Sequence, residues 1–211
     1  MKTSRITIAL ALAAVAAGST AALALQGTSK EAKPASAPTT DDMEAMQSKW
    51  TAYATPGPAH DVLKTKAGNW NFTMKWWMTP GSTPEESMGT SENTWILGDR
   101  YLMDETQGTV MGESFTGHGT TGYDNLKKKY VSSWIDNMST GIMTMEGTYD
   151  AATKTFTWKG EGPDPMAGKY MPMRMVERMM DADKWTAEMF CTDHATGKEF
   201  KAAEFTYTRA N

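Results

Sequence analysis

The side chains best suited to chemistry lie in two neighbouring segments near the middle of the chain. In the first, alternate residues would share one face of a strand: Tyr130, Ser132, Trp134 and Asp136. Glu146 lies in the second segment. A carboxylate beside an aromatic ring in an apolar cavity is typical of a small-molecule site. The same groups are equally consistent with a solvated face, because the sequence does not reveal which side of the strand is interior.

An enzymatic function would need at least two titratable groups that converge on one cavity. Asp136 or Glu146 could act as acid or base, with His118 or Arg174 nearby. The Gly-x-Ser-x-Gly pattern of serine hydrolases does not occur. Cys191 is the only cysteine and could pair with His118, but a lone cysteine on a strand is usually a small buried hydrophobe. We therefore assign no catalytic residue, and an enzyme is the weaker hypothesis.

Metal binding has few candidate ligands. The chain has three histidines, His60, His118 and His194, which gives little material for a zinc or haem site. Every second residue from Met171 to Met175 is a methionine, and thioethers that project from one face of a strand could hold Cu(I). The chain contains 18 methionines, and pliable filling of a core or pocket explains most of them better. No metal or other cofactor is predicted.

Three glycines spell the Gly-x-Gly-x-x-Gly pattern of dinucleotide-binding loops: Gly117, Gly119 and Gly122. That pattern binds a pyrophosphate only where a strand leads into a helix. Here Tyr123-Asp124-Asn125 indicates a turn, and another strand follows it. We interpret the glycines as residues that let a strand bend around a barrel wall.

The first residues resemble a secretory leader. Lys2 and Arg5 precede an apolar stretch, and Ala22-Leu23-Ala24 suits signal peptidase, so we place the leader at residues 1–24. Residues 25–40 form a flexible linker of small, polar and proline residues, and 41–211 form a single domain. These features predict export to the periplasm or the extracellular space. An uncleaved leader would tether the protein to a membrane, and no later apolar run is long enough to span one.

Charge narrows the range of partners. The leader contains two of the 21 basic residues and none of the 25 acidic ones, so the mature chain carries a net charge of −6. Nucleic acids and anionic membrane surfaces bind proteins that carry dense positive charge, so neither is an expected partner. With a single cysteine, the domain must be stabilised by packing.

The elements that position these residues can be read from their periodicity. Asp41 and Glu44 begin a helix that carries Trp50, and a second short helix runs from about 59 to 67. From Trp70 the apolar period changes to two, and about ten strands follow. They span about 70–78, 87–97, 100–108, 113–123, 129–137, 140–149, 154–160, 169–180, 184–192 and 198–209. Trp134 and Ile135 face opposite ways and both look buried, so we expect the helix that carries Trp50 to cover this strand.

Short turns between the strands leave no room for crossover helices, so the sheet must be largely antiparallel with sequence neighbours paired. Closing such a meander removes its exposed edges. We therefore predict an all-β fold, an up-and-down barrel of about ten strands with the N-terminal helices plugging one end or lying against the wall. An open or sandwiched sheet is the alternative.

Several segments of the chain resemble the bacterial family called domain of unknown function 1579. They are Thr55-Pro56-Gly57 with His60 and Leu63, Gly68-Asn69-Trp70, the run from Trp95 to Leu102, the block from Gly117 to Asn125, Tyr130 to Asp136, Ser139 to Met143, Glu146 to Asp150, and Asp164-Pro165-Met166 with Gly168-Lys169. The match covers residues 41–209. The resemblance implies a calycin-like (lipocalin-like) β-barrel, and it supplies no activity and no catalytic residues.

The leading functional hypothesis is a non-enzymatic barrel that binds a small apolar or amphipathic molecule. It is based on the barrel topology, the eight tryptophans, the many methionines and the lack of a catalytic constellation. The proposed ligand-binding residues are Trp76, Trp95, His118, Tyr123, Trp134, Asp136, Glu146 and Arg174. The alternatives are the enzyme outlined above and a structural protein of the cell envelope. The oligomeric state is not predicted.

Overall fold

The computed structural model describes residues 38–210. The predicted leader and most of the predicted linker lie outside these residues. No helix in the described part of the chain is long and apolar enough to cross a membrane.

The first helix, α1 (Thr40–Ala54), has Asp41 and Asp42 in its first turn, where negative charge interacts favourably with the helix dipole. None of its residues is buried. The expectation that this helix covers the strand bearing Ile135 is wrong, because Trp50 is 59% exposed and Ile135 47% exposed. Helical spacing of apolar residues reveals a face of the helix, but it does not reveal what covers that face.

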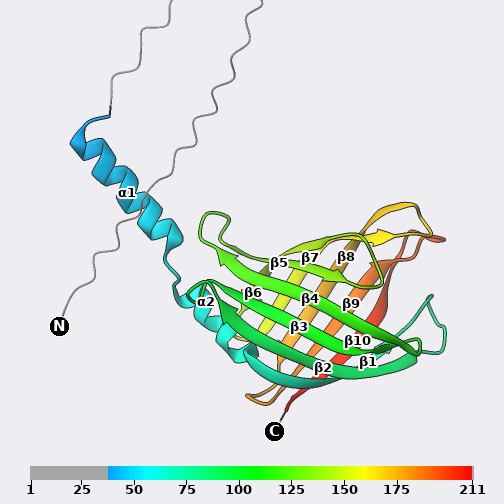
Figure 1. Ribbon diagram of the computed structural model, residues 1–211. Helices are drawn as coiled ribbons and strands as arrows, with labels where there is room; N and C mark the ends of the chain where they lie inside the picture. Colours follow the sequence, from blue (N-terminus) through cyan, green and yellow to red (C-terminus); the bar gives the residue numbers. More distant parts are fainter. Residues whose placement is uncertain (1–37, 211) are drawn as a thin grey trace, which may run out of the picture. The chain divides into compact units, whose positions relative to one another are not determined.

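Ten strands follow the helices, as the period-two pattern predicts (Figure 1). They are β1 (Gly68–Trp76), β2 (Glu85–Ile96), β3 (Tyr101–Val110), β4 (Glu113–Asp124), β5 (Lys129–Asp136), β6 (Met143–Asp150), β7 (Thr155–Asp164), β8 (Lys169–Met179), β9 (Lys184–Thr192) and β10 (Glu199–Arg209). Strand β7 continues four residues past its predicted end, and Asp164 then caps the turn by accepting a hydrogen bond from the Met166 amide at 2.9 Å.

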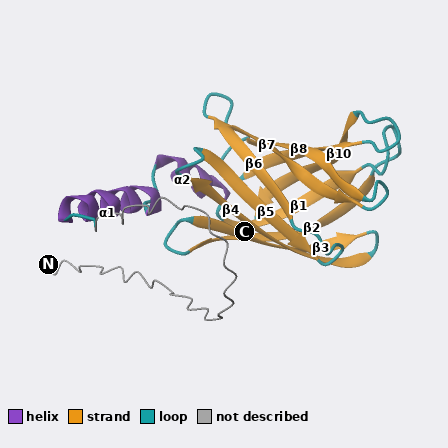
Figure 2. Cartoon of the chain, turned by 90° about the horizontal axis from the view of Figure 1, so that it is seen from above, coloured by secondary structure: helices purple, strands orange, loops and turns teal. Residues whose placement is uncertain are grey.

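Each strand pairs antiparallel with the next, and β1 pairs with β10, which closes the barrel (Figures 1 and 2). A bulge between Lys201 and Ala203 interrupts the β9 and β10 register. Closure leaves no strand edge unpaired, which confirms the prediction of an up-and-down barrel over an open or sandwiched sheet.

A short helical segment plugs one end of the barrel. Helix α2 (Pro58–Val62) continues into the 3-10 turn η1 (Leu63–Lys66), and Leu63 is completely buried in a cluster with Tyr130, Phe156 and Trp158. The Tyr130 hydroxyl donates a hydrogen bond to the Ala59 carbonyl at 2.9 Å, and burial raises the pKa of Tyr130 to about 12. We call this end of the barrel the closed end, and the opposite end the mouth.

Candidate functional site

The strand register identifies the side chains that point into the barrel, because directly paired residues on antiparallel strands share a face. Trp70 and Phe72 of β1 are buried and therefore point inward. The residues paired with them on β2 and β10 also point inward, and the same step repeated from strand to strand gives the inward residues of the whole barrel. Five of the eight proposed ligand-binding residues point inward: Trp76, Trp95, Tyr123, Trp134 and Asp136. Of these, Trp76, Trp134 and Asp136 lie near the mouth, whereas Trp95 and Tyr123 lie near the closed end.

The other three, His118, Glu146 and Arg174, lie on the outer wall. His118 Nδ1 is 3.8 Å from Glu105 Oε1. Glu146 accepts hydrogen bonds from two lysines, Lys127 at 2.7 Å and Lys129 at 2.8 Å, and these partners lower its pKa to about 2. Arg174 binds both carboxylate oxygens of Glu199, at 2.6 and 3.1 Å. Each group is therefore engaged with a surface partner.

These positions contradict the convergence that the enzymatic alternative requires, because Asp136 alone of its four groups faces the lumen. Cys191 faces inward and His118 outward, so they cannot act as a pair. Burial also raises the pKa of the Cys191 thiol to about 11, which keeps it protonated and weakly nucleophilic.

The two halves of the lumen differ in how tightly they are filled. Near the closed end, inward side chains such as Phe156, Trp158 and Trp185 are buried. Near the mouth, the inward side chains keep contact with solvent and are only half-buried: Met74, Trp76, Phe115, Trp134, Met143, Met171, Met173, Met189, Cys191 and Phe205. The lumen is therefore accessible from the mouth, and methionine and aromatic side chains line it.

Inward glycines allow large side chains to lie flat against the barrel wall. A β-carbon on Gly117 would collide with the Trp134 ring, and one on Gly162 would collide with the Met173 sulfur. A β-carbon on Gly89 would lie 2.7 Å from the Phe72 ring. These side chains therefore lie close over the glycines of the neighbouring strands. The glycine-rich stretch of β4 thus has the geometric role predicted from the sequence.

Trp134 is held in place by Asp136. The indole Nε1 donates to Asp136 Oδ2 at 2.9 Å, and Asp136 Oδ1 accepts from the Met138 amide at 3.0 Å. Phe115 stacks on Trp134 with ring centroids 6.3 Å apart. Both carboxylate oxygens of Asp136 are engaged, so this residue positions the tryptophan and the following hairpin.

Most of the loops at the mouth are uncharged. Four of the hairpin loops there, residues 77–84, 111–112, 137–142 and 165–168, contain no Asp, Glu, Lys or Arg. Each carries one exposed methionine: Met78, Met111, Met138 and Met166. The fifth loop, 193–198, differs because it contains Asp193, His194 and Lys198. A hollow of about 710 Å³ lies along the mouth ends of β1, β2 and β3. Its lining includes the inward Met74 and Ser87, but most of it lies on the outer wall, with the outward Thr73, Lys75, Glu86, Met88 and Thr109.

A cluster of polar side chains that was not predicted from the sequence forms the floor of the lumen. Lys66 Nζ is 2.9 Å from Glu177 Oε1, and Glu177 Oε2 accepts from Trp158 Nε1 at 3.0 Å. On β2 and β3, across the barrel from β8, Asp104 accepts hydrogen bonds from Ser91 at 2.9 Å and from Thr106 at 2.7 Å. Polar residues at every second position of two predicted strands were the available signal for Asp104.

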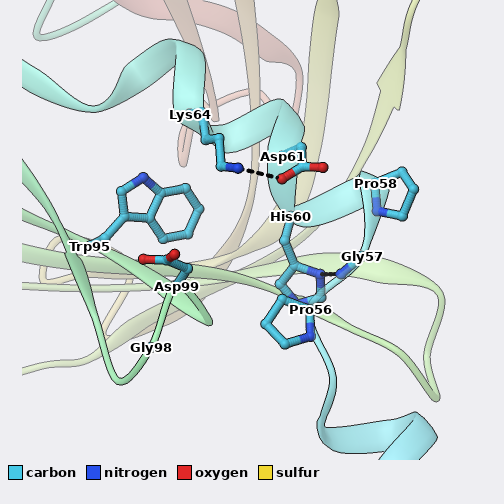
Figure 3. Close-up of a pocket in the computed structure, with 9 residues that line it drawn as sticks. All are labelled: Pro56, Gly57, Pro58, His60, Asp61, Lys64, Trp95, Gly98 and Asp99. Carbon is cyan, nitrogen blue, oxygen red and sulfur yellow. Dashed lines mark hydrogen bonds and ion pairs between the residues drawn. The ribbon is translucent and has the colours of Figure 1, made fainter. Parts of the chain in front are cut away.

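A smaller hollow of about 220 Å³ lies beside α2, between His60, Trp95 and Asp99 (Figure 3). Its polar groups are engaged with one another: Lys64 pairs with Asp61 at 2.7 Å, and His60 Nδ1 accepts from the Gly57 amide at 3.1 Å. Burial lowers the pKa of His60, so the imidazole stays neutral. Among residues 38–210, no group of three or more His, Cys, Asp or Glu side chains is placed to hold a metal ion.

The fold and the lumen define a class: a closed antiparallel barrel of the lipocalin or calycin type, plugged at one end and accessible at the other. The chain belongs to the family described as protein of unknown function (DUF1579), whose model matches residues 55–209. The family resemblance seen in the sequence is thereby confirmed. No curated protein matches the chain.

Similar solved structures include Rv2717c from M. tuberculosis, which is 14% identical with a TM-score of 0.57 and is matched over 74% of this chain and 100% of that chain. The S-type phycobiliprotein lyase CPES from Guillardia theta is 9% identical with a TM-score of 0.52, over 77% of this chain and 97% of that chain. At these identities the likeness concerns the fold alone.

Proposed function

We propose that this protein is a non-enzymatic carrier that binds a small apolar or amphipathic molecule in the mouth half of its lumen. The observation that carries the proposal is the set of inward methionine and aromatic side chains that remain half-buried there. In a barrel that served only as a stable domain, packing to the density of a normal core would bury these side chains.

The lining suits a ligand with a flexible apolar body. Methionine side chains adapt to irregular shapes. The inward Met189 lies on β9, next to the strand that carries Phe205, and Met173 packs against the cluster that contains Trp158. The four methionine-bearing loops offer an apolar entry path, because they carry no charged group that would have to be desolvated as a ligand passes. In this proposal Trp76 and Trp134 contact the ligand, and Asp136 keeps Trp134 in position.

Export belongs to the same proposal. A leader at residues 1–24 would place the carrier in the periplasm or outside the cell, where apolar molecules need a binding protein to cross an aqueous space. Comparing the mass of the N-terminal peptide from the native host with that of the full chain would test whether the leader is removed.

Titration with N-phenyl-1-naphthylamine, a neutral probe that fluoresces in apolar surroundings, would test lumen binding. We expect saturable binding and energy transfer from tryptophan. Met189→Glu should weaken binding by more than about tenfold, because it places a charge in the apolar lumen. Met180→Glu is the matched control, because Met180 is 51% exposed and follows β8 at the closed end, and it should bind as the unaltered protein does.

Circular dichroism would verify that both variants keep the barrel. Equal loss of binding in the two variants, or no saturable binding at all, would overturn the proposal. Native mass spectrometry of protein purified from its own host would identify the carried molecule.

A further inference from the structure

We propose that the floor of the lumen binds a single positive charge, so that the ligand is an amphipathic monocation whose amine or quaternary ammonium head group contacts Asp104. This inference rests on the proposed lumen binding. It adds the chemical class of the head group and the residue that recognises it.

Asp104 is inward-facing and only partly engaged. It pairs with Asn93 and Gly119 across the neighbouring strands, and its side chain keeps some contact with solvent. Thr106 donates to Oδ1, and the single hydroxyl proton of Ser91 is shared between this oxygen and Asn93 Oδ1, each at 2.9 Å. Among the described residues, none donates a hydrogen bond to Oδ2, so this oxygen is available to a ligand in the lumen.

The charges around Asp104 do not balance. Lys66 is the cation whose charge lowers the pKa of Asp104, and it is already paired with Glu177 at 2.9 Å. Arg209, at the closed end, is paired with Asp183 at 2.9 Å. When Asp104 is ionised, Lys66, Glu177 and Asp104 together carry one excess negative charge. A buried charge without a partner is unfavourable, so the floor favours either a proton or one bound cation.

The surroundings suit an organic cation. Asp104 and the Trp134 indole flank Gly119, since a β-carbon there would lie 3.3 Å from Asp104 Cβ and 3.2 Å from Trp134 Cε3. A cation beside Asp104 would therefore lie next to an aromatic ring, which attracts positive charge. The apolar body of the ligand would extend toward the mouth, past the half-buried methionines.

Protons compete with the cation for Asp104. Burial raises the pKa of the Asp104 carboxyl, and Glu177 raises it further, whereas Ser91, Thr106 and Lys66 oppose the shift. Tyr207 also interacts electrostatically with Asp104. Burial, with the negative charges of Asp104 and Glu177, raises its pKa well above its usual value, so it stays neutral. Affinity for a cation should therefore fall as the pH is lowered through the raised pKa of Asp104.

Displacement of N-phenyl-1-naphthylamine by decyltrimethylammonium and by decyl sulfate, both below micelle-forming concentrations, would test the inference. The two detergents share a chain length and differ in the sign of the head-group charge. We expect decyltrimethylammonium to displace the probe at a concentration at least about tenfold lower. Asp104→Asn should abolish this preference, and Asp104→Glu should retain it. Glu105→Gln, on the outer wall next to Asp104, is the matched control and should leave the preference unchanged.

The pH dependence gives a second readout, because a quaternary ammonium does not titrate. Its affinity should fall at low pH in the unaltered protein and stay constant in Asp104→Asn. Equal displacement by both detergents, or a cation preference that survives in Asp104→Asn, would overturn the inference while leaving lumen binding intact. Absence of binding by the neutral probe would refute the proposed function itself. If Asp104→Asn does not fold, the pH dependence of the unaltered protein decides.

Discussion

Replacing Lys66 by methionine should test how strongly the plug is fixed to the barrel. Lys66 belongs to η1, and its partner Glu177 belongs to β8, so their ion pair joins the closed end to the wall. The side chains are 11% and 7% exposed. Lys66→Met would leave Glu177 buried without its cation, which typically destabilises a protein by about 3–5 kcal/mol.

The same substitution removes the ammonium that lies 4.4 Å from the centroid of the Trp185 ring. Two other contacts of Lys66 should persist, because its backbone carbonyl accepts from Trp70 Nε1 at 2.9 Å and from Asn93 Nδ2 at 2.8 Å. The loss should therefore reflect the ion pair and the cation over the ring. It should not reflect melting of the plug.

The double variant Lys66→Met with Glu177→Gln separates these contributions. Glutamine can still accept a hydrogen bond from Trp158 Nε1 and needs no cation, so the double variant should lie within about 1–2 kcal/mol of the unaltered protein. Urea unfolding followed by tryptophan fluorescence measures each free energy, and a loss of about 4 kcal/mol should lower the midpoint by about 2 M. A cost below about 1 kcal/mol for Lys66→Met, or additive effects in the double variant, would refute the reasoning.

Two further predictions concern the walls of the lumen. Gly117→Ala should destabilise the protein by about 1–3 kcal/mol and shift the fluorescence emission of Trp134, because the added methyl displaces the indole. Gly57→Ala is the control, because no atom lies within 4 Å of the added carbon, and it should leave the emission unchanged. Cys191 should react slowly with iodoacetamide at pH 8 in the folded protein and rapidly in urea, because burial raises its pKa to about 11. Rapid labelling of the folded protein would contradict the raised pKa of the thiol.

The sequence was sufficient to predict the strands and their closure, because apolar residues at every second position indicate a strand with one interior face. It was not sufficient to assign the phase of every strand. His118 lies between inward Gly117 and Gly119, and glycines have no side chain to mark a face. Arg174 and Glu146 have methionine or glycine neighbours, and methionine occurs on both faces of this barrel, as outward Met88 and inward Met189 illustrate.

The polar floor was harder to predict for a different reason. Asp104 and Glu177 look like ordinary surface carboxylates in a strand, and Lys66 looks like the exposed end of a helix. Their burial follows from closure of the barrel over η1, which brings together residues 111 positions apart, as in the pair Lys66 and Glu177. No local pattern contains that information.

Asp104→Asn provides a test of whether the floor is a binding site or a part of the core. The Asp104 pKa is raised in the folded state, so ionisation of this group disfavours folding above its unfolded pKa, and the penalty is complete above the folded pKa. Asparagine is not charged and can still accept from Ser91 and Thr106. The variant should therefore be more stable than the unaltered protein at pH 7, by urea unfolding, and the difference should vanish as the pH falls below the unfolded pKa. If Asp104 served only to stabilise the core, Asp104→Asn would destabilise the protein at every pH. Higher stability together with lost cation preference is the combination expected of a site that is completed by its ligand.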